Sequence, residues 1–457
     1  MPSHITESRI YGGAYSSPEF AAIFSDSNQV QKWLDVERAL AQTQAQMGII
    51  PHEAAREIAR VAKVELFDLE GLGRESRETG HILIPAIRAL ARSCSDEWGE
   101  YVHYGVTTQD ILDTGLILQI KEAWDQVLAR LYSIRNHLIV LAQRHKHTPM
   151  VARTHGQQAL PTTFGYKVAV WIDELDRHLE RFGEAYARVM VGNLTGAVGT
   201  LASFGTQGFE IQQRTLASLG LGAPLTSWHC ARDRILEAAW LLVQTSLTLG
   251  RVANEIYHLQ RTEIDEVREG FRPGQVGSST MPHKQNPSTV DLISALSRLV
   301  RAQMVALTDA AFQLHERDGT TWRIEWAALP ELFIYAGALL TRMEEVLTVG
   351  LDIREERMRS NLDLLGGLIL SERVMLALSA QFGKQTAHEL VHEVSLHARQ
   401  NALPFRDALL QDEHLRGCFT SQALEDLLNP ATYVGLAADM VDRVARNNVH
   451  PTSKGDL

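Results

Sequence analysis

The stretch Gly274–Pro287 combines two serines, two glycines, two prolines, a histidine, a lysine and an asparagine. It follows a region that is expected to form a helix of about 35 residues. A long Gly/Ser loop in a compact domain is usually functional or disordered, and disorder does not explain the dense run Met281–Asn286. We interpret the stretch as a mobile lid that carries a serine nucleophile or base, with Lys284 and Asn286 available to bind anions.

Two further polar stretches lie beside predicted long helices. His103–Asp110 precedes such a helix, and its threonines and Asp110 could simply form an N-cap. The same free N–H groups and hydroxyls suit a bound carboxylate, so both interpretations stay open. Arg153–Gly165 lies between two long helices, and a capping loop would not need His155, Gln157 and Gln158 together.

Two other segments are more ambiguous. His315–Pro330 mixes charged and aromatic residues, which is typical either of a solvated helix junction or of a pocket wall. His388–His392 matches the HExxH pattern of zinc metalloproteases. It has no third-ligand signature beside it, so we expect a surface helix face and no metal site.

The intervening sequence is helical almost throughout. Leu116–His147 contains neither proline nor glycine, and Arg232–Glu269 contains only Gly250. Apolar residues there alternate spacings of three and four, as in a bundled helix about 50 Å long. The predicted class is therefore all-α, with a central long-helix bundle assembling into a helical core. The expected divisions are an N-terminal domain at 1–105, the bundle at 106–355 and a C-terminal domain at 356–457.

Composition excludes several classes of protein. Lys and Arg total 44 against 55 Asp and Glu, a net charge of −11, which disfavours nucleic acid and acidic membranes as partners. Cys94, Cys230 and Cys418 lie far apart, which indicates a reducing compartment rather than a disulfide framework. No uninterrupted apolar run reaches the roughly 18 residues of a membrane span, and the N-terminus is polar. We expect a cytoplasmic protein.

The loop Gly277–Pro287 resembles GSSxMPxKxNP, the signature of the fumarase/aspartase superfamily. Together with Gly105–Asp110 and Thr154–Gly156 in the same order, the resemblance covers residues from about 10 to 445. The chain is most similar to the branch of adenylosuccinate lyase and 3-carboxy-cis,cis-muconate cycloisomerase. The segments that carry this similarity are Tyr101–Gly105, Thr154–Gly156, Pro161–Gly165, Gly196–Gly199 and His315–Asp318.

The resemblance implies a cofactor-independent β-elimination from a succinyl group that releases fumarate. Ser278 resembles the catalytic base and His155 the general acid, while Lys284 and Asn286 resemble ligands of the dicarboxylate. The other residues expected to bind substrate are His81, His103, Thr107, Thr108, Gln109, Asp110, Thr154, Gln157, Ser279, Met281, Arg323 and Trp326.

Elementary chemistry is consistent with these roles. Proton removal beside a carboxylate creates a dianion that prepositioned donors must stabilise. A serine acts as base only if its alkoxide is stabilised, here by N–H groups of Gly277–Thr280 that would lower its pKa. A histidine that titrates near neutrality can protonate the leaving atom. The sequence leaves the choice between Ser278 and Ser279 open.

The Thr107 and Thr154 segments bracket one unbroken helix of about 40 residues, so they would lie roughly 50 Å apart within one chain. If both serve one active site, they must come from different subunits. Antiparallel packing of identical long helices brings opposite ends together. We therefore predict a homotetramer with D2 symmetry and shared sites, as the resemblance also implies.

Departures from the family pattern narrow the activity. Both arginines of the N-terminal adenylosuccinate lyase motif are missing from Ala14–Glu19, and the phosphate-binding segment reads Trp322–Trp326. Phosphate needs Arg or Lys and hydroxyls, which Trp326 cannot supply although Arg323 could compensate. The leading hypothesis is a phosphate-independent C–N lyase that acts on an N-substituted aspartate or related succinyl compound.

Three alternatives remain. The Trp322–Trp326 pattern favours carboxymuconate cycloisomerisation, although that branch typically has Trp where this chain has His155. Adenylosuccinate cleavage is the second alternative. A non-catalytic relative is the third, and the joint presence of Ser278, His155, Lys284 and Asn286 argues against it.

Overall fold

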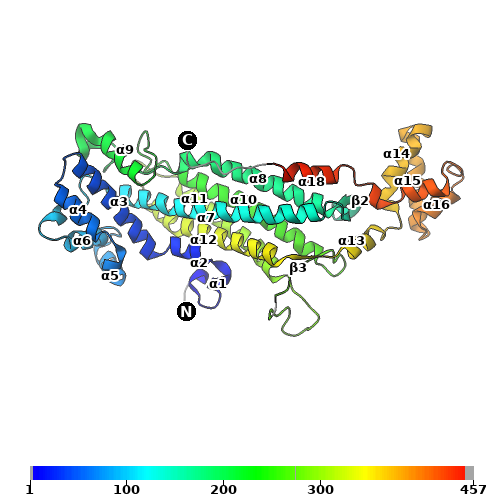
Figure 1. Ribbon diagram of the computed structural model, residues 1–457, viewed down its shortest axis with the longest axis horizontal. Coiled ribbons are helices and arrows are strands. Elements are labelled where there is room, and N and C mark those ends of the chain that lie inside the picture. The colour runs from blue at the N-terminus through cyan, green and yellow to red at the C-terminus, as the bar shows by residue number, and fades with distance from the viewer. Residues whose placement is uncertain (1–3, 273, 448–457) are drawn as a thin grey trace.

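The computed structural model describes residues 4–272 and 274–447 and shows an elongated, mostly helical molecule (Figure 1). Long helices run side by side through the middle, and shorter helices gather at both ends. The predicted all-α class is confirmed. The strands are short and form two separate two-stranded pairs within the described residues.

The N-terminal end is built from short and medium helices around one longer helix. These helices are α1 (Gly12–Tyr15), α2 (Pro18–Ile23), α3 (Asp26–Gln46), α4 (His52–Val61), α5 (Leu69–Thr79) and α6 (Ile84–Ser93). Ser17 and Ser25 cap α2 and α3 by accepting backbone N–H groups with their hydroxyls. Phe20 lies so close to Gly337 that an added Cβ would be 2.2 Å from its ring, which fixes α2 against the bundle.

The central bundle contains the longest helices. They are α7 (Thr108–Arg144), α8 (Phe164–Val189), α10 (Asp233–Leu259), α11 (Ser288–Ala310) and α12 (Gly319–Val349), with α9 (Gly208–Ser218) outside the bundle. α11 packs against α10 and α12, and α7 packs against α8, α3 and α12. α10 is 27 residues long and not the predicted 35, because the chain turns after Leu259 and Asp265 takes a positive φ of 55°.

The strand pairs are the feature that helical periodicity did not predict. β1 (Pro149–Thr154) and β2 (Gln157–Thr163) form an antiparallel hairpin between α7 and α8. Its turn consists of His155 and Gly156, both with positive φ, as two-residue hairpins favour. β3 (Val267–Glu269) pairs with β4 (Leu351–Ile353) at the root of the glycine- and serine-rich loop.

The C-terminal end is again made of shorter helices. They are α13 (Glu355–Leu362), α14 (Ser371–Phe382), α15 (Lys384–Gln400), α16 (Phe405–Gln411), α17 (Ser421–Leu427) and α18 (Ala437–Ala445). α14 to α17 enclose their own apolar cluster, whereas α18 returns to pack on α8. His388 and His392 lie on an exposed face of α15 with stacked rings, and the described residues contain no group of three potential metal ligands.

α12 is long and apolar enough to cross a membrane by length and composition, the one such helix among the described residues. It has no uninterrupted apolar run of that length, so this property was not evident from the sequence. Of its most apolar 18-residue window, 61% is buried inside the protein, as in the core helix of a bundle.

Candidate active site

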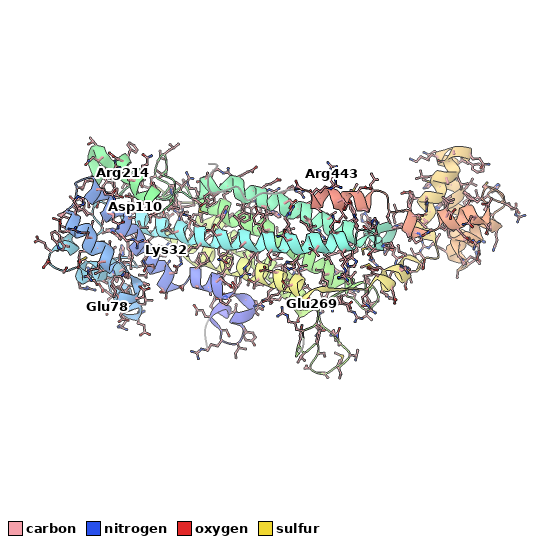
Figure 2. All side chains as sticks on the ribbon, in the orientation of Figure 1. Lys32, Glu78, Asp110, Arg214, Glu269 and Arg443 are labelled. Atoms are coloured by element: carbon pink, nitrogen blue, oxygen red, sulfur yellow. The ribbon has the colours of Figure 1, made fainter. Side chains whose placement is uncertain are left out.

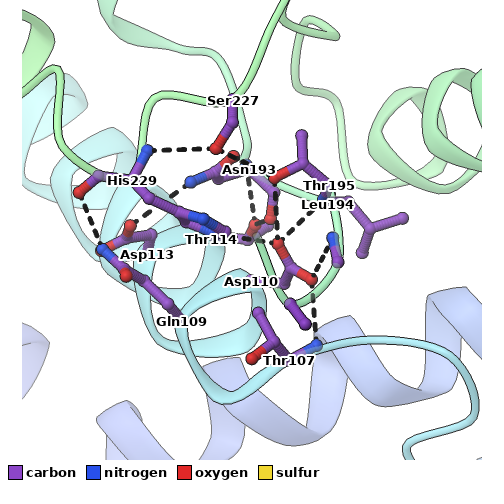
Figure 3. Close-up of polar contacts among 12 residues, drawn as sticks. Thr107, Gln109, Asp110, Asp113, Thr114, Asn193, Leu194, Thr195, Ser227 and His229 are labelled. Atoms are coloured by element: carbon purple, nitrogen blue, oxygen red, sulfur yellow. Dashed lines mark hydrogen bonds and ion pairs between the residues drawn. The ribbon is translucent and has the colours of Figure 1, made fainter. Parts of the chain in front are cut away.

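Asp110 organises the N-terminal end of α7 (Figure 3). Its side chain is fully buried and accepts hydrogen bonds from the backbone N–H groups of Thr107 (3.0 Å), Thr195 (2.8 Å) and Gly196 (2.9 Å). His229 Nε2 lies 3.1 Å from the same carboxylate. The predicted capping role is therefore present, and the carboxylate also holds a distant loop against the helix start.

Two histidines flank this helix start. His81 lies 3.2 Å from the Thr108 hydroxyl through Nε2, and its Nδ1 accepts the backbone N–H of Ile84. Burial, together with the nearby His103, lowers the pKa of His81. Because Nδ1 is an acceptor, the neutral ring carries its proton on Nε2, directed toward Thr108.

His103 has the opposite electrostatic character. Burial would lower its pKa, but the carboxylate of Glu37, 2.6 Å from Nδ1, outweighs burial and raises the pKa of His103. Glu37 also accepts the backbone N–H of His103 and thereby holds the residue at a φ of 60°. The pair leaves Nε2 of His103 as the ring atom available to a ligand.

Arg317 is a residue that the sequence analysis did not single out. Its guanidinium donates to the Gln109 side chain (2.9 Å), the Thr107 hydroxyl (3.1 Å) and the Ala197 carbonyl (3.0 Å). The segment His315–Pro330 was predicted to be either a junction or a pocket wall, and it provides both. Asp318 caps α12, and Trp322 and Trp326 pack edge to face.

A cavity of about 360 Å³ opens beside this cluster. Its lining includes His81, Thr108, Arg317 and Trp326. Arg323 also lines it with an exposed side chain. Groups from the predicted carboxylate-binding segment thus share one cavity with the predicted aromatic wall.

The predicted general acid lies elsewhere. His155 occupies the tip of the β1–β2 hairpin and is exposed, as are Thr154 and Gln157. Positive φ is uncommon for a residue other than glycine, and such positions cluster at functional sites. Arg153 anchors the hairpin by donating to both oxygens of the buried Glu266 at 2.8 Å.

The signature loop forms a third, separate group. The Ser278 hydroxyl oxygen accepts the backbone N–H of Met281 (3.0 Å) and of Thr280 (3.4 Å). Within the described part of the chain, the Ser279 hydroxyl makes one hydrogen bond, with the Thr280 hydroxyl at 3.5 Å. Lys284 and Met281 are exposed, and the backbone N–H of Asn286 donates to the Gly277 carbonyl.

The three groups do not meet within one chain. α7 has 37 residues, so its ends are about 55 Å apart. Asp110 lies near the N-terminal end of this helix and the hairpin near the other (Figures 1 and 2). The signature loop projects from the side of the bundle beyond Glu269. Each chain therefore presents three incomplete parts of the expected site.

Comparison with known proteins identifies the family. The family model for lyases matches residues 13–302, and the model for the adenylosuccinate lyase C-terminus matches residues 367–444. The chain belongs to the fumarase/aspartase superfamily of lyases. The predictions of an adenylosuccinate lyase-like enzyme and of a fumarate-releasing lyase are confirmed.

Individual relatives match this lyase over nearly its whole length. It is 44% identical to the N-acetyl-S-(2-succino)cysteine lyase of Dickeya dadantii over 98% of both chains. It is 40% identical to the adenylosuccinate lyase of Methanocaldococcus jannaschii over 94% of both. The crystal structure of β-carboxy-cis,cis-muconate cycloisomerase from Acinetobacter calcoaceticus is 33% identical, with a TM-score of 0.90 covering 96% of this chain and 100% of that one.

Several residues around the site carried no local signal. Glu37 acts on His103 from 66 residues away, and Glu266 meets Arg153 across 113 residues. Thr195 and His229 reach Asp110 from loops that showed no motif beyond the Gly196–Gly199 similarity. The similarity of His315–Asp318 to the family was also a signal, because it pointed to the neighbourhood of Arg317, but it did not identify the partners of Arg317.

Proposed function

We propose that this lyase cleaves the C–S or C–N bond of a phosphate-free succinyl compound, with Ser278 as base and His155 as acid. Ser278 removes a proton from the carbon beside a carboxylate. The electron pair forms the double bond of fumarate as the neighbouring bond to sulfur or nitrogen breaks. His155 protonates the leaving atom.

The hydrogen bonds to Ser278 carry this proposal. A serine becomes a base only when its alkoxide is stabilised, and two backbone N–H groups already converge on Ser278. Ser279 has no such pair of donors among the described residues. Thr107, Thr108 and Gln109, with Lys284 and Asn286, are the donors proposed for the two carboxylates of the succinyl group.

The similarity to N-acetyl-S-(2-succino)cysteine lyases favours a thioether over an amine as substrate. The direct test supplies the purified enzyme with fumarate and separate panels of thiols and amines, and follows the loss of fumarate by its ultraviolet absorbance. Addition of at least one thiol or amine supports the proposal. No addition in either panel, together with no fumarate release from the corresponding adducts, would contradict it.

Cycloisomerisation of a carboxymuconate is the second candidate, favoured by the Trp322–Trp326 pair beside the cavity. The same preparation incubated with 3-carboxy-cis,cis-muconate distinguishes the two. Lactone formation at a higher kcat/KM than elimination from any of the thiol or amine adducts would select this candidate.

We further propose that the active site is assembled from several subunits of a D2 homotetramer. The separation of the three groups along the bundle supports this arrangement, since antiparallel copies bring opposite helix ends together. Mixing Ser278→Ala subunits with His155→Ala subunits after mild dissociation should restore part of the activity, because some sites then receive both native residues. A fully active monomer on a sizing column would contradict the proposal.

The division into domains at 1–105, 106–355 and 356–457 also stays a proposal. The separate apolar cluster of α14 to α17 supports the last boundary. A cytoplasmic location is proposed from the three widely separated cysteines, which fit a reducing compartment.

A further inference from the structure

A second cavity of about 260 Å³ adjoins the outer one at the start of α12. Ile82, Leu112, Trp322 and Trp326 line both cavities, so they form the neck between them. None of the roles assigned above uses this inner cavity. Its position beyond the predicted carboxylate-binding residues makes it the place where the far end of a leaving group would lie.

The floor of the inner cavity contains two buried carboxylates. Asp113 and Glu325 both line it, and both bind the buried Arg232. Glu325 accepts from Nε of Arg232 at 2.9 Å, and Asp113 accepts from Nη1 at 2.8 Å. Two carboxylates thus share one guanidinium. The floor is negative when both are ionised and neutral when Glu325, whose pKa burial raises, is protonated.

Other acceptors add to this floor. The Gln119 side chain donates one N–H to the Ile23 carbonyl at 2.7 Å, and its oxygen remains as an acceptor beside the second N–H. Residue 330 is proline, so the carbonyl of Trp326 has no i+4 N–H partner within α12. Among the described residues, no lysine, arginine or histidine lines the inner cavity.

The outer cavity has the opposite chemistry. His81, Arg317 and Arg323 line it, together with the Thr108 hydroxyl. An anionic group is therefore favoured at the mouth, and a hydrogen-bond donor is favoured behind the tryptophan neck. A leaving group that passes the neck would meet acceptors, and the nearby cation, Arg232, is already shared by two carboxylates.

We infer that the inner cavity is a specificity site that binds a nitrogen donor, an acylamino or ammonium group, at the far end of the leaving group and rejects an anionic end. The inference rests on the proposed function and names the leaving-group class. It also gives a physical reason against phosphate-bearing substrates, since a buried anion without a cation is strongly disfavoured.

The experiment uses a series of S-succinyl thioethers that share one alkyl spacer and differ only in the terminal group. The ends are acetamide, ammonium, methyl and carboxylate, and kcat/KM is measured from fumarate release. The acetamide or ammonium compound should exceed the carboxylate compound by about tenfold or more. If fumarate is released and the carboxylate compound has an equal or higher kcat/KM than the acetamide and ammonium compounds, the inference is overturned. No release from any member instead counts against the proposed function.

Matched variants then locate the effect. Leu116 lines the inner cavity and Leu128 does not, although both are half-buried leucines of α7. Leu116→Lys should lower the ratio of kcat/KM for the acetamide or ammonium compound to kcat/KM for the carboxylate compound by about tenfold. Leu128→Lys should leave this ratio unchanged. If Leu116→Lys does not fold, Gln29→Lys at the half-buried edge of the cavity serves the same purpose. An unchanged ratio in the folded cavity variant overturns the inference.

Discussion

The start of α7 and the signature loop represent two different ways of holding reactive groups. At the start of α7, the buried carboxylates of Asp110 and Glu37 and the exposed guanidinium of Arg317 each hold neighbouring groups through several hydrogen bonds. In the loop, Lys284 is exposed, and among the described residues the N–H groups that bind Ser278 belong to the loop itself. Substitutions in the first region should therefore lower the stability of the fold, whereas substitutions in the second should alter catalysis with little effect on stability.

Ser278→Ala tests this contrast most strongly. We expect kcat to fall by about a thousandfold, because a general base contributes factors of 10² to 10⁴. The melting temperature and oligomeric state should stay unchanged, since the lost contacts lie within the loop. Ser279→Ala is the control and should cost less than about tenfold. A larger loss for Ser279→Ala would reassign the base.

Asp110→Asn should have the opposite signature. It replaces a buried carboxylate that accepts from three backbone N–H groups with an amide that has a single acceptor oxygen. We expect a loss of about 3 kcal/mol in the free energy of unfolding, because buried donors are left unpaired. Urea denaturation measures this. A variant with the unfolding free energy of the wild type and only a reduced kcat would contradict this contrast between the start of α7 and the signature loop.

Glu269→Gln tests the boundary between the regions. Glu269 ends β3 and accepts the N–H groups of Thr289 and Val290, so it closes the base of the signature loop. Loss of these charge-assisted bonds should cost about 1–2 kcal/mol of stability and lower kcat/KM through misplacement of Ser278. Glu263→Gln, which changes an exposed carboxylate nearby, is the control and should change neither quantity.

Glu37→Gln should have the smallest effect and depend on pH. The pair raises the pKa of His103 in the folded protein, so its stabilisation is complete below the unfolded value of about 6.5. It is lost as the pH rises through the raised pKa. The difference in unfolding free energy between wild type and variant should therefore shrink from pH 6 toward pH 8. Titration of His103 by NMR should show a lowered pKa in the variant.

Sequence reasoning identified much of this architecture, because periodicity and short motifs are local properties. The long helix was expected from the absence of proline and glycine over Leu116–His147, and capping by Asp110 was one of the two interpretations of its position. The hairpin at His155 was not predicted, since a two-residue turn with positive φ has no reliable signal when it reads His-Gly. The length of α10 was overestimated because nothing local marks the turn near Asp265.

The sequence by itself determined the helical class, the signature loop and the residue types available for elimination. Only the tertiary structure decided their electrostatic environment. Glu37 raises the pKa of His103, Arg317 ties Gln109 to Thr107, and Asp113 and Glu325 share Arg232. These effects depend on charges brought within hydrogen-bond distance from positions far apart in the chain, and sequence spacing does not encode such distances.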